Sequence, residues 1–137
     1  MIEKELLKVI YEQTGGNENF ALIRSKGDQA LFNRTTAQMK ERWDIQNKPL
    51  ADFMPTILLK AKDFATEITI YNAKEKNMKN ENQISNEHVT NNKAVRETLI
   101  SRAIVPENVK PEEDIKKVER KLSCEKKKTL GSKDSLR

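Results

Sequence analysis

The sequence predicts an all-α fold, a compact bundle of about five helices with short connecting loops. Its 137 residues include only four Gly and four Pro, so few tight turns are expected. Residues that favour helices, such as Glu, Lys, Ala and Leu, are frequent, and apolar residues recur at helical spacing in several segments. With 36% hydrophobic and 5% aromatic residues the core should be small, which argues against a large enzyme scaffold.

The first segment predicts a short helix followed by a loop. Ile2, Leu6 and Val9 fall at helical spacing, and the pattern stops before the run Gln13-Thr14-Gly15-Gly16, where paired glycines disfavour a helix. Residues 16–27 have a mixed pattern. They predict a packed loop, with or without one helical turn.

Residues 28–45 predict one continuous helix. Asp28 is placed for an N-cap or first-turn role. Phe32, Thr36, Met39 and Trp43 then recur at intervals of four, three and four, which is the spacing of one buried stripe. Trp43 is therefore expected in the core rather than on the surface.

A corner and the strongest helix follow. Pro49 and Pro55 bracket residues 50–54 and predict a short helical turn between two longer helices. Thr56 is then the predicted N-cap of a long helix. Its buried stripe is predicted to be Ile57, Ala61, Phe64, Ile68 and Tyr71, widened by Leu58 and Ala65.

Residues 74–82 are polar and predict a solvated helix end and loop. The next helix is expected to begin near Ile84, with Ser85 as N-cap and His88 at the third helical position, and to end before Pro106. A last helix is predicted from Pro111, with Ile115, Val118 and Leu122 as its buried positions. Residues 1–122 thus form one predicted domain, and residues 123–137 a disordered Lys-rich tail.

The charge of the chain permits nucleic acid as a partner without requiring it. The 26 Lys and Arg against 21 Asp and Glu give a formal net charge of +5. Glu41 and Asp44 lie among the basic residues of the 28–45 helix, so this helix face is less suited to binding a phosphate backbone. The candidate nucleic-acid contacts are Arg24, Lys26, Arg34, Lys40, Arg42, Lys60, Lys62, Lys126, Lys127 and Lys128.

The residues that carry chemistry are few. With one Cys and one His, no intramolecular disulfide and no cluster of Cys and His ligands can form. His88 is interpreted as a partly exposed histidine at a helix start, Cys124 as an incidental thiol, and Gly15-Gly16 lacks the spacing of a phosphate loop. We expect no enzyme activity, no metal and no cofactor. We also expect a soluble, cytoplasmic protein, because neither a signal peptide nor a membrane-spanning run is present.

Two segments carry a specific family resemblance. LADFMPTILLKAKDFATEIT (50–69) and ISNEHVTNNKAVRETLISRAIVPENVKPEEDIKKVERKL (84–122) resemble the C-terminal half of the bacterial DNA-damage-inducible protein D (DinD) family. The resemblance covers roughly residues 27–122 and rests on the Asn-Glu-His-Val, Asn-Asn-Lys-Ala-Val-Arg and Glu-Asp-Ile-Lys-Lys-Val-Glu-Arg runs. Members of the family have a first half of the phage and baculovirus repeated-ORF (BRO) type, which this chain lacks. It is therefore expected to be a C-terminal module.

Two positions depart from the family pattern. Ala103 replaces the usual Gly, which predicts that the preceding helix runs on slightly. The link at residues 109–111, Val-Lys-Pro, replaces a sequence closer to Leu-Pro-Pro.

The resemblance implies a role in the bacterial DNA-damage (SOS) response, with association to a recombinase filament on DNA, and it supplies no catalytic motif. Three readings stay open. The chain is a helical module that binds a recombination protein or its DNA filament, or a nonspecific DNA-binding protein related to phage antirepressor-type regulators, or a dimerisation module that uses the Ile57 to Tyr71 stripe.

Overall fold

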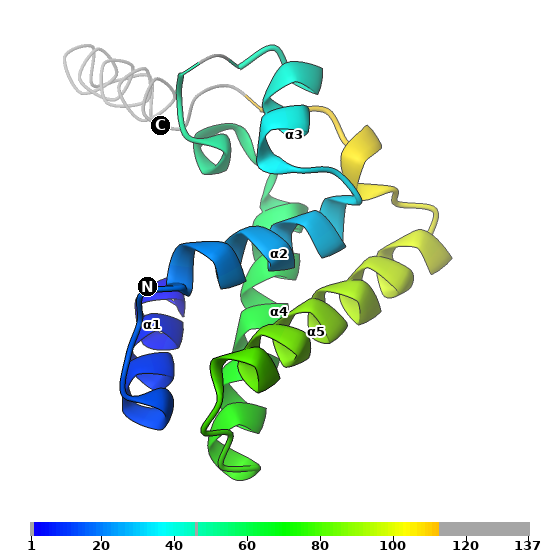
Figure 1. Cartoon of the computed structure of the whole chain (residues 1–137). Helices are drawn as coiled ribbons and strands as arrows, with labels where there is room; N and C mark the ends of the chain where they lie inside the picture. The colour runs from blue at the N-terminus through cyan, green and yellow to red at the C-terminus, as the bar shows by residue number, and fades with distance from the viewer. Residues whose placement is uncertain (1, 46, 113–137) are drawn as a thin grey trace, which may run out of the picture.

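The computed structural model describes residues 2–45 and 47–112, which contain five α-helices, two 3₁₀ helices and no strand. The all-α prediction is confirmed (Figure 1). The helices are α1 (Ile2–Thr14), α2 (Phe20–Phe32), α3 (Thr36–Arg42), η1 (Leu50–Phe53), α4 (Thr56–Glu75), α5 (Glu81–Ser101) and η2 (Pro106–Asn108).

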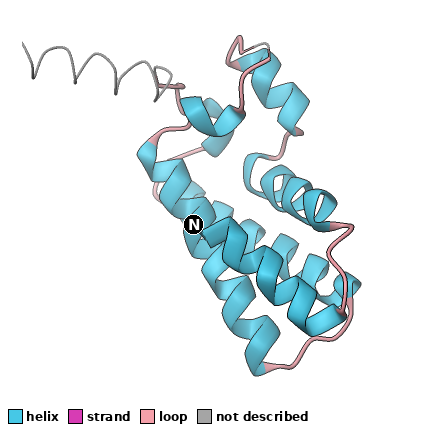
Figure 2. Cartoon of the chain, turned by 90° about the vertical axis from the view of Figure 1, so that its left-hand side faces the viewer, coloured by secondary structure: helices cyan, strands magenta, loops and turns pink. Residues whose placement is uncertain are grey.

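The long helices α4 and α5 form the centre of the fold. α5 packs against both α2 and α4, and α1 packs against the other side of α4. Figure 2 shows that loops join the helices without any sheet, and that the short helices α3 and η1 lie at one end of the long pair. α3 and η1 therefore close one end of the bundle.

Two apolar clusters share these helices. The larger one is built around Leu31, Phe32, Trp43 and Leu58 at the α3 end, and the smaller one around Leu6 and other residues of α1. α2, α4 and α5 each contribute to both clusters. Each of these three helices thus passes from one apolar cluster to the other.

A buried polar layer separates the two clusters. Along α4, Thr69 lies one turn from Ala65 of the larger cluster and one turn from Ala73 of the smaller one. Along α5, His88 and Asn92 hold the equivalent place between Ile84 and Val95, and both are less than 5% exposed. Their polar atoms must therefore be satisfied within the protein.

The predicted continuous helix over residues 28–45 is wrong, and so is the predicted loop over residues 16–27. α2 already begins at Phe20, and the chain then breaks at Asn33, whose φ of 54° is left-handed. Thr35 starts α3 with a capping box, since its hydroxyl accepts from the Gln38 N–H and the Gln38 side chain accepts from the Thr35 N–H. Asn tolerates the left-handed region, and Thr-x-x-Gln is a helix-start signal that the apolar spacing masked.

The predicted burial of Trp43 is confirmed. Its side chain is 8% exposed and meets the Phe32 ring edge to face at 6.1 Å between centroids. Its indole N–H donates to the Val109 carbonyl at 3.2 Å. Trp43 thus anchors the larger cluster with its polar end satisfied, as a buried Trp requires.

The corner between Pro49 and Pro55 is confirmed as η1, but half of the predicted stripe of α4 faces solvent. Ile57, Phe64 and Tyr71 are 46%, 62% and 65% exposed. The inner face instead carries mainly small residues: Leu58, Ala61, Ala65, Thr66, Thr69, Ile70 and Ala73. Small side chains let α1 and α5 approach closely, whereas a search for large apolar residues selects the outer face. Thr56 is the first helical residue of α4, and Pro55 occupies the N-cap position instead.

α5 begins four residues before its predicted N-cap at Ser85. Asn80 is the N-cap, and its side chain accepts from the Asn82 N–H at 2.7 Å. His88 consequently lies inside the helix and is 4% exposed, so the prediction of a partly exposed helix-start histidine is wrong.

α5 also ends at Ser101, although Ala103 was predicted to let this helix continue. Ala103 has a left-handed φ of 64°, the Ala103 N–H donates to the Ile100 carbonyl, and the Ile104 N–H donates to the Leu99 carbonyl. These two bonds form a Schellman motif, in which the left-handed position is usually Gly. The predicted last helix starts at Pro111 and extends beyond the described residues, which end at residue 112. The predicted tail, with Cys124 and the Lys126 to Lys128 run, lies outside the described residues.

Candidate functional site

Two of the candidate basic residues are held in an ion cluster between α1, α2 and α4. Lys62 Nζ lies 3.3 Å from Asp28 Oδ1 and 3.7 Å from Glu3 Oε1, and its side chain is only 15% exposed. Arg24 lies 3.3 Å from the same Glu3 carboxylate. Burial raises the pKa of Asp28, although the Lys62 ammonium opposes the shift. Arg24 and Lys62 thus stabilise the helix packing instead of standing free for phosphate.

The polar layer centres on the Thr69 hydroxyl, which donates to the Ala65 carbonyl at 2.9 Å. His88 Nδ1 lies 2.9 Å from this oxygen, and Asn91 Nδ2 donates to it at 3.0 Å. Since the hydroxyl has one proton, Nδ1 of His88 is assigned as a donor. Burial, aided by the Lys62 charge, lowers the pKa of His88 to about 4, so this imidazole is neutral at pH 7.

Gly27 of α2 lies directly over the His88 ring. A Cβ atom built on Gly27 would lie 2.4 Å from His88 Cδ2 and 2.5 Å from Nε2. Only a glycine lets the α2 backbone approach the imidazole this closely. His88 is therefore enclosed by α2 and α4 and serves the packing of three helices.

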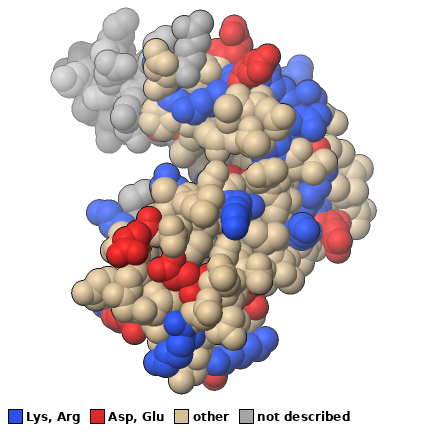
Figure 3. All heavy atoms as spheres, in the orientation of Figure 1, with Lys and Arg blue, Asp and Glu red and all other residues tan. Residues whose placement is uncertain are grey.

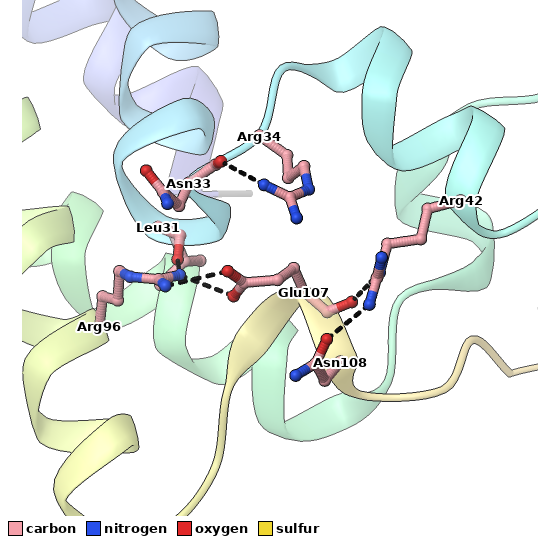
Figure 4. Close-up of polar contacts among 7 residues, drawn as sticks. All are labelled: Leu31, Asn33, Arg34, Arg42, Arg96, Glu107 and Asn108. Atoms are coloured by element: carbon pink, nitrogen blue, oxygen red, sulfur yellow. Dashed lines mark hydrogen bonds and ion pairs between the residues drawn. The ribbon is translucent and has the colours of Figure 1, made fainter.

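Three arginines converge on Glu107 in η2 (Figure 4). Arg96 pairs with its carboxylate through two bonds of 2.8 and 3.0 Å and also donates to the Leu31 carbonyl at 3.0 Å. Arg42 donates to the Glu107 carbonyl at 2.7 Å and to the Asn108 side chain. Burial alone would raise the pKa of Glu107, but the bonds and charge of Arg96, with a contribution from Arg34, lower it. This arrangement fastens residues 104–112, the C-terminal strap, to α2, α3 and α5.

An open groove lies between α2 and α5 and has a volume of about 480 Å³. Lys26 of α2 and Lys93 of α5 are exposed along it, with Val89 and Ala30 as apolar lining. Gln29, Asn33, Arg96 and Glu97 complete the walls. The groove can thus offer two cations, amide groups and a small apolar surface to one ligand.

Lys93 and Arg96 were not among the binding residues predicted from the sequence. The spacing of four between Val89, Lys93 and Glu97 places them on one helix face, which was a usable signal. The sequence did not predict that they share a groove with Lys26, because residues 20–27 were expected to form a loop. Only the packing of α2 on α5 brings Lys26 and Lys93 to one groove.

The remaining candidate contacts are scattered. Arg34 and Arg42 line a second, smaller hollow on α3 together with Gln38 and Glu41. Lys40 is half-buried, whereas Lys60 lies on the outer side of α4. In Figure 3, Lys and Arg side chains are dense over the upper part of the face, where α3 lies, but Asp and Glu side chains interrupt them. Among the described residues, the predicted contacts therefore do not form one continuous basic patch.

A third groove, of about 220 Å³, runs between α4 and α5 and is almost entirely apolar. Ile57 and Phe64 of α4 line it with Val95 and Leu99 of α5, and Lys60 lies at its edge. Phe64 and Ile57 also project into solvent. Ile57 and Phe64 thus belong to the stripe of α4 that was predicted to be buried, but they lie on its outer face.

Metal-ligand groups and membrane-spanning helices are both absent from the described part of the chain. Among residues 2–45 and 47–112, no three His, Cys, Asp or Glu side chains are grouped so that they could hold a metal ion. None of the described helices is both long and apolar enough to cross a membrane.

Comparison with known protein families identifies the family of the chain. The family model described as the DinD C-terminal domain matches residues 3–118, which is most of the chain and all of its long helices. Neither the curated proteins nor the solved structures gave a significant match. The family is DNA-damage-related, in agreement with the resemblance of the Asn-Glu-His-Val and Asn-Asn-Lys-Ala-Val-Arg runs. The chain belongs to the DinD C-terminal domain family.

Proposed function

We propose that this chain is a non-enzymatic interaction module of the bacterial DNA-damage response, which binds a recombination protein or that protein's filament on DNA. The observation that carries the proposal is the α2–α5 groove with Lys26 and Lys93 along it. Membership of the DinD C-terminal domain family supports the context of DNA damage.

The lining of the groove favours a protein surface over a bare phosphate backbone. Lys26 and Lys93 can each pair with a carboxylate of a partner, while Gln29 and Asn33 can bond to a partner backbone. Val89 and Ala30 provide apolar contact between these polar groups. A mixed lining of this kind suits an acidic segment of a folded or filamentous protein.

Direct nonspecific DNA binding is the second candidate. Up to residue 112 the chain contains 17 Lys and Arg against 16 Asp and Glu, so this part is almost neutral. Arg24, Lys62 and Arg42 are engaged by other groups of the chain. The surplus of positive charge lies in residues 113–137, with nine Lys and Arg against five Asp and Glu. DNA contact by the tail would strengthen binding to a filament that already carries DNA.

The test is a binding measurement with three targets: recombinase alone, recombinase filament on single-stranded DNA, and the same DNA without recombinase. We expect binding to recombinase or to the filament to exceed binding to DNA alone. Replacing both groove lysines, Lys26→Glu and Lys93→Glu, should weaken this binding by about tenfold or more, as removal of close charge pairs does.

A matched control replaces exposed lysines outside the groove, Lys4→Glu on α1 and Lys79→Glu in the α4–α5 turn. This control changes the net charge by the same amount and should leave most of the binding intact. Equal loss in both double variants would show a general charge effect and contradict the groove. No binding to recombinase, with or without DNA, would reject the function itself.

A further inference from the structure

We propose that the outer face of α4 is the interface of an antiparallel homodimer, formed by Ile57, Phe64 and Tyr71 of two copies of this chain. The inference goes beyond the proposed function, because it concerns a different surface. On α5, the α2–α5 groove uses Val89, Lys93 and Glu97, whereas the α4–α5 groove uses Val95, Thr98 and Leu99. A dimer through α4 would leave the α2–α5 groove open.

The three side chains form one straight apolar stripe. They recur every seven residues, so that successive members are turned by only about 20° around the helix axis. The stripe from Ile57 to Tyr71 is about 21 Å long at 1.5 Å per residue. All three side chains are more than 40% exposed in the single chain, although each is large and hydrophobic. Large exposed hydrophobic side chains grouped on one helix face mark a candidate interaction surface.

The stripe is symmetric about Phe64, which favours a second copy as its occupant. Ile57 and Tyr71 lie at equal distances on either side of Phe64. A two-fold axis through Phe64 therefore places Phe64 against Phe64 of the second copy and Ile57 against Tyr71 of the second copy, twice. Self-complementary contacts of this type are what a two-fold dimer interface requires.

The charges beside the stripe select the antiparallel direction. Lys60 and Glu67 are exposed on the same flank of α4, four residues before and three residues after Phe64. In the antiparallel pair, Lys60 of each copy faces the region of Glu67 of the other, which gives two opposite-charge contacts. A parallel pair would place this flank of the two copies on opposite sides of the interface, so that neither opposite-charge contact would form.

The apolar groove beside the stripe gives the second copy a place to dock. It is lined by Ile57, Ala61 and Phe64 of α4 and by Val95 and Leu99 of α5. In the antiparallel pair the Tyr71 ring of the second copy lies next to Ile57, at the mouth of this groove. An aromatic ring that enters an apolar pocket is a common anchor of protein interfaces.

The first test is the mass of the full chain in solution over a range of concentrations, with reducing agent present so that Cys124 cannot link two copies. We expect the mass to rise from 15.8 kDa toward twice this value. Phe64→Glu should weaken association by about 30-fold or more, the size of a central hot-spot loss. Leu22→Glu, at another exposed apolar residue on α2, should have no effect. Circular dichroism on both variants checks that each is folded.

The second test fixes the direction of the two helices by cysteine cross-linking in a Cys124→Ser background. Phe64→Cys should form a disulfide-linked dimer by itself, because it lies on the two-fold axis. Tyr71→Cys should link only when mixed with Ile57→Cys. Lys60→Glu and Glu67→Lys should each weaken association, and the two together should restore it.

Several outcomes would overturn the proposal. A monomer at the highest soluble concentration rejects the dimer, even if Phe64→Glu abolishes binding of a recombination protein. A dimer that Phe64→Glu leaves intact uses another face. Self-linking of Tyr71→Cys and of Ile57→Cys would show a parallel pair and reject the antiparallel one.

Discussion

Gly27 is the residue that sets the distance between α2 and α5. Ala in place of Gly in a helix interior normally adds up to about 1 kcal/mol of stability. Here the added methyl group would overlap the His88 ring, whose nearest atoms lie 2.4 and 2.5 Å from the Cβ position. The buried imidazole cannot move away without disturbing the Thr69 and Asn91 bonds.

Gly27→Ala should therefore lower the free energy of unfolding by about 2 kcal/mol, as overpacking of a core does. Urea unfolding followed by circular dichroism measures the change. Gly16→Ala is the control, since the nearest atoms to its Cβ lie 3.8 Å away and its φ is not positive. A Gly27→Ala variant as stable as the native chain would contradict the close approach.

His88 should make the stability depend on pH. Its pKa falls from 6.5 in the unfolded chain to about 4 in the folded one, mainly because burial disfavours the imidazolium. Between these values the unfolded state binds the proton more tightly. The contribution of His88 is thus complete above pH 6.5 and is lost as pH falls toward 4, by about 3 kcal/mol in all.

Unfolding curves at several pH values should show this loss, and His88→Gln should flatten it, although the variant starts from a lower stability. Glu107 acts in a lower window, because its depressed pKa places its loss of stability below its ordinary value of 4.5. The raised pKa of Asp28 gives a slope of opposite sign. An unchanged slope between pH 6.5 and 4 in His88→Gln would show that His88 does not cause the loss.

At the scale of elements, the end of α5 carries a residue poorly suited to its conformation. Ala103 has a φ of 64°, where a Cβ atom costs about 1 kcal/mol and Gly costs nothing. The two bonds of the Schellman motif and the strap beyond it hold Ala103 in place. Tertiary contacts of the strap thus override the preference of Ala to continue the helix.

Ala103→Gly should raise the free energy of unfolding by about 1 kcal/mol, measured by thermal or urea unfolding. Ala94→Gly, at an exposed position inside the same helix, should lower it by about the same amount. A loss of stability in both variants would indicate that residue 103 is helical in solution.

The C-terminal strap depends on one partly buried ion pair. Arg96 and Glu107 have side chains that are 18% and 9% exposed, and Arg96 also satisfies the last turn of α2 through Leu31. Arg96→Met would leave the Glu107 carboxylate without its main partner. Breaking a buried pair on one side usually costs about 3 kcal/mol.

We therefore expect Arg96→Met to lower stability by about 3 kcal/mol and to increase amide hydrogen exchange in residues 104–112. Lys8→Met breaks the exposed Lys8–Glu12 pair on α1 and should change stability by less than about 0.5 kcal/mol. Normal exchange protection of the strap in Arg96→Met would show that Arg42 and Trp43 hold it without Arg96.

At the scale of the whole molecule, charge is distributed unevenly along the chain. Residues up to 112 are almost neutral, and most of the +5 net charge comes from residues 113–137. Any nonspecific affinity for DNA should therefore depend on the tail. This expectation separates the DNA-binding candidate from a function in the α2–α5 groove.

Replacing Lys126, Lys127 and Lys128 by Gln in the full chain should lower DNA affinity at low salt. It should also reduce the slope of log affinity against log salt by up to about three, roughly one for each phosphate that a lysine no longer neutralises. Lys26→Gln with Lys93→Gln should change this slope less. Unchanged DNA affinity after the tail substitution would place DNA binding on the helical part of the chain.

The helical class could be predicted from the sequence alone, and so could the first helix, the corner at residues 50–53, the inward position of Trp43 and the family. These features depend on local signals: apolar residues at helical spacing, prolines, and runs such as Asn-Glu-His-Val. Spacing is sufficient for Trp43 because a large aromatic residue on a regular stripe has few alternatives to the core.

Packing between the helices determines which side of α4 faces inward, and the bounds of α2 were likewise not predictable from the sequence pattern. Gly27, Ala65 and Ala73 have weak hydrophobic signals, yet they form the contacts because close helix packing selects small residues. Phe64 and Tyr71 have strong signals and remain outside. Periodicity gives the angle between side chains on one helix, whereas the choice of the buried face depends on the neighbouring helices. The groove of Lys26 and Lys93 and the strap on Arg96 arise only from that packing.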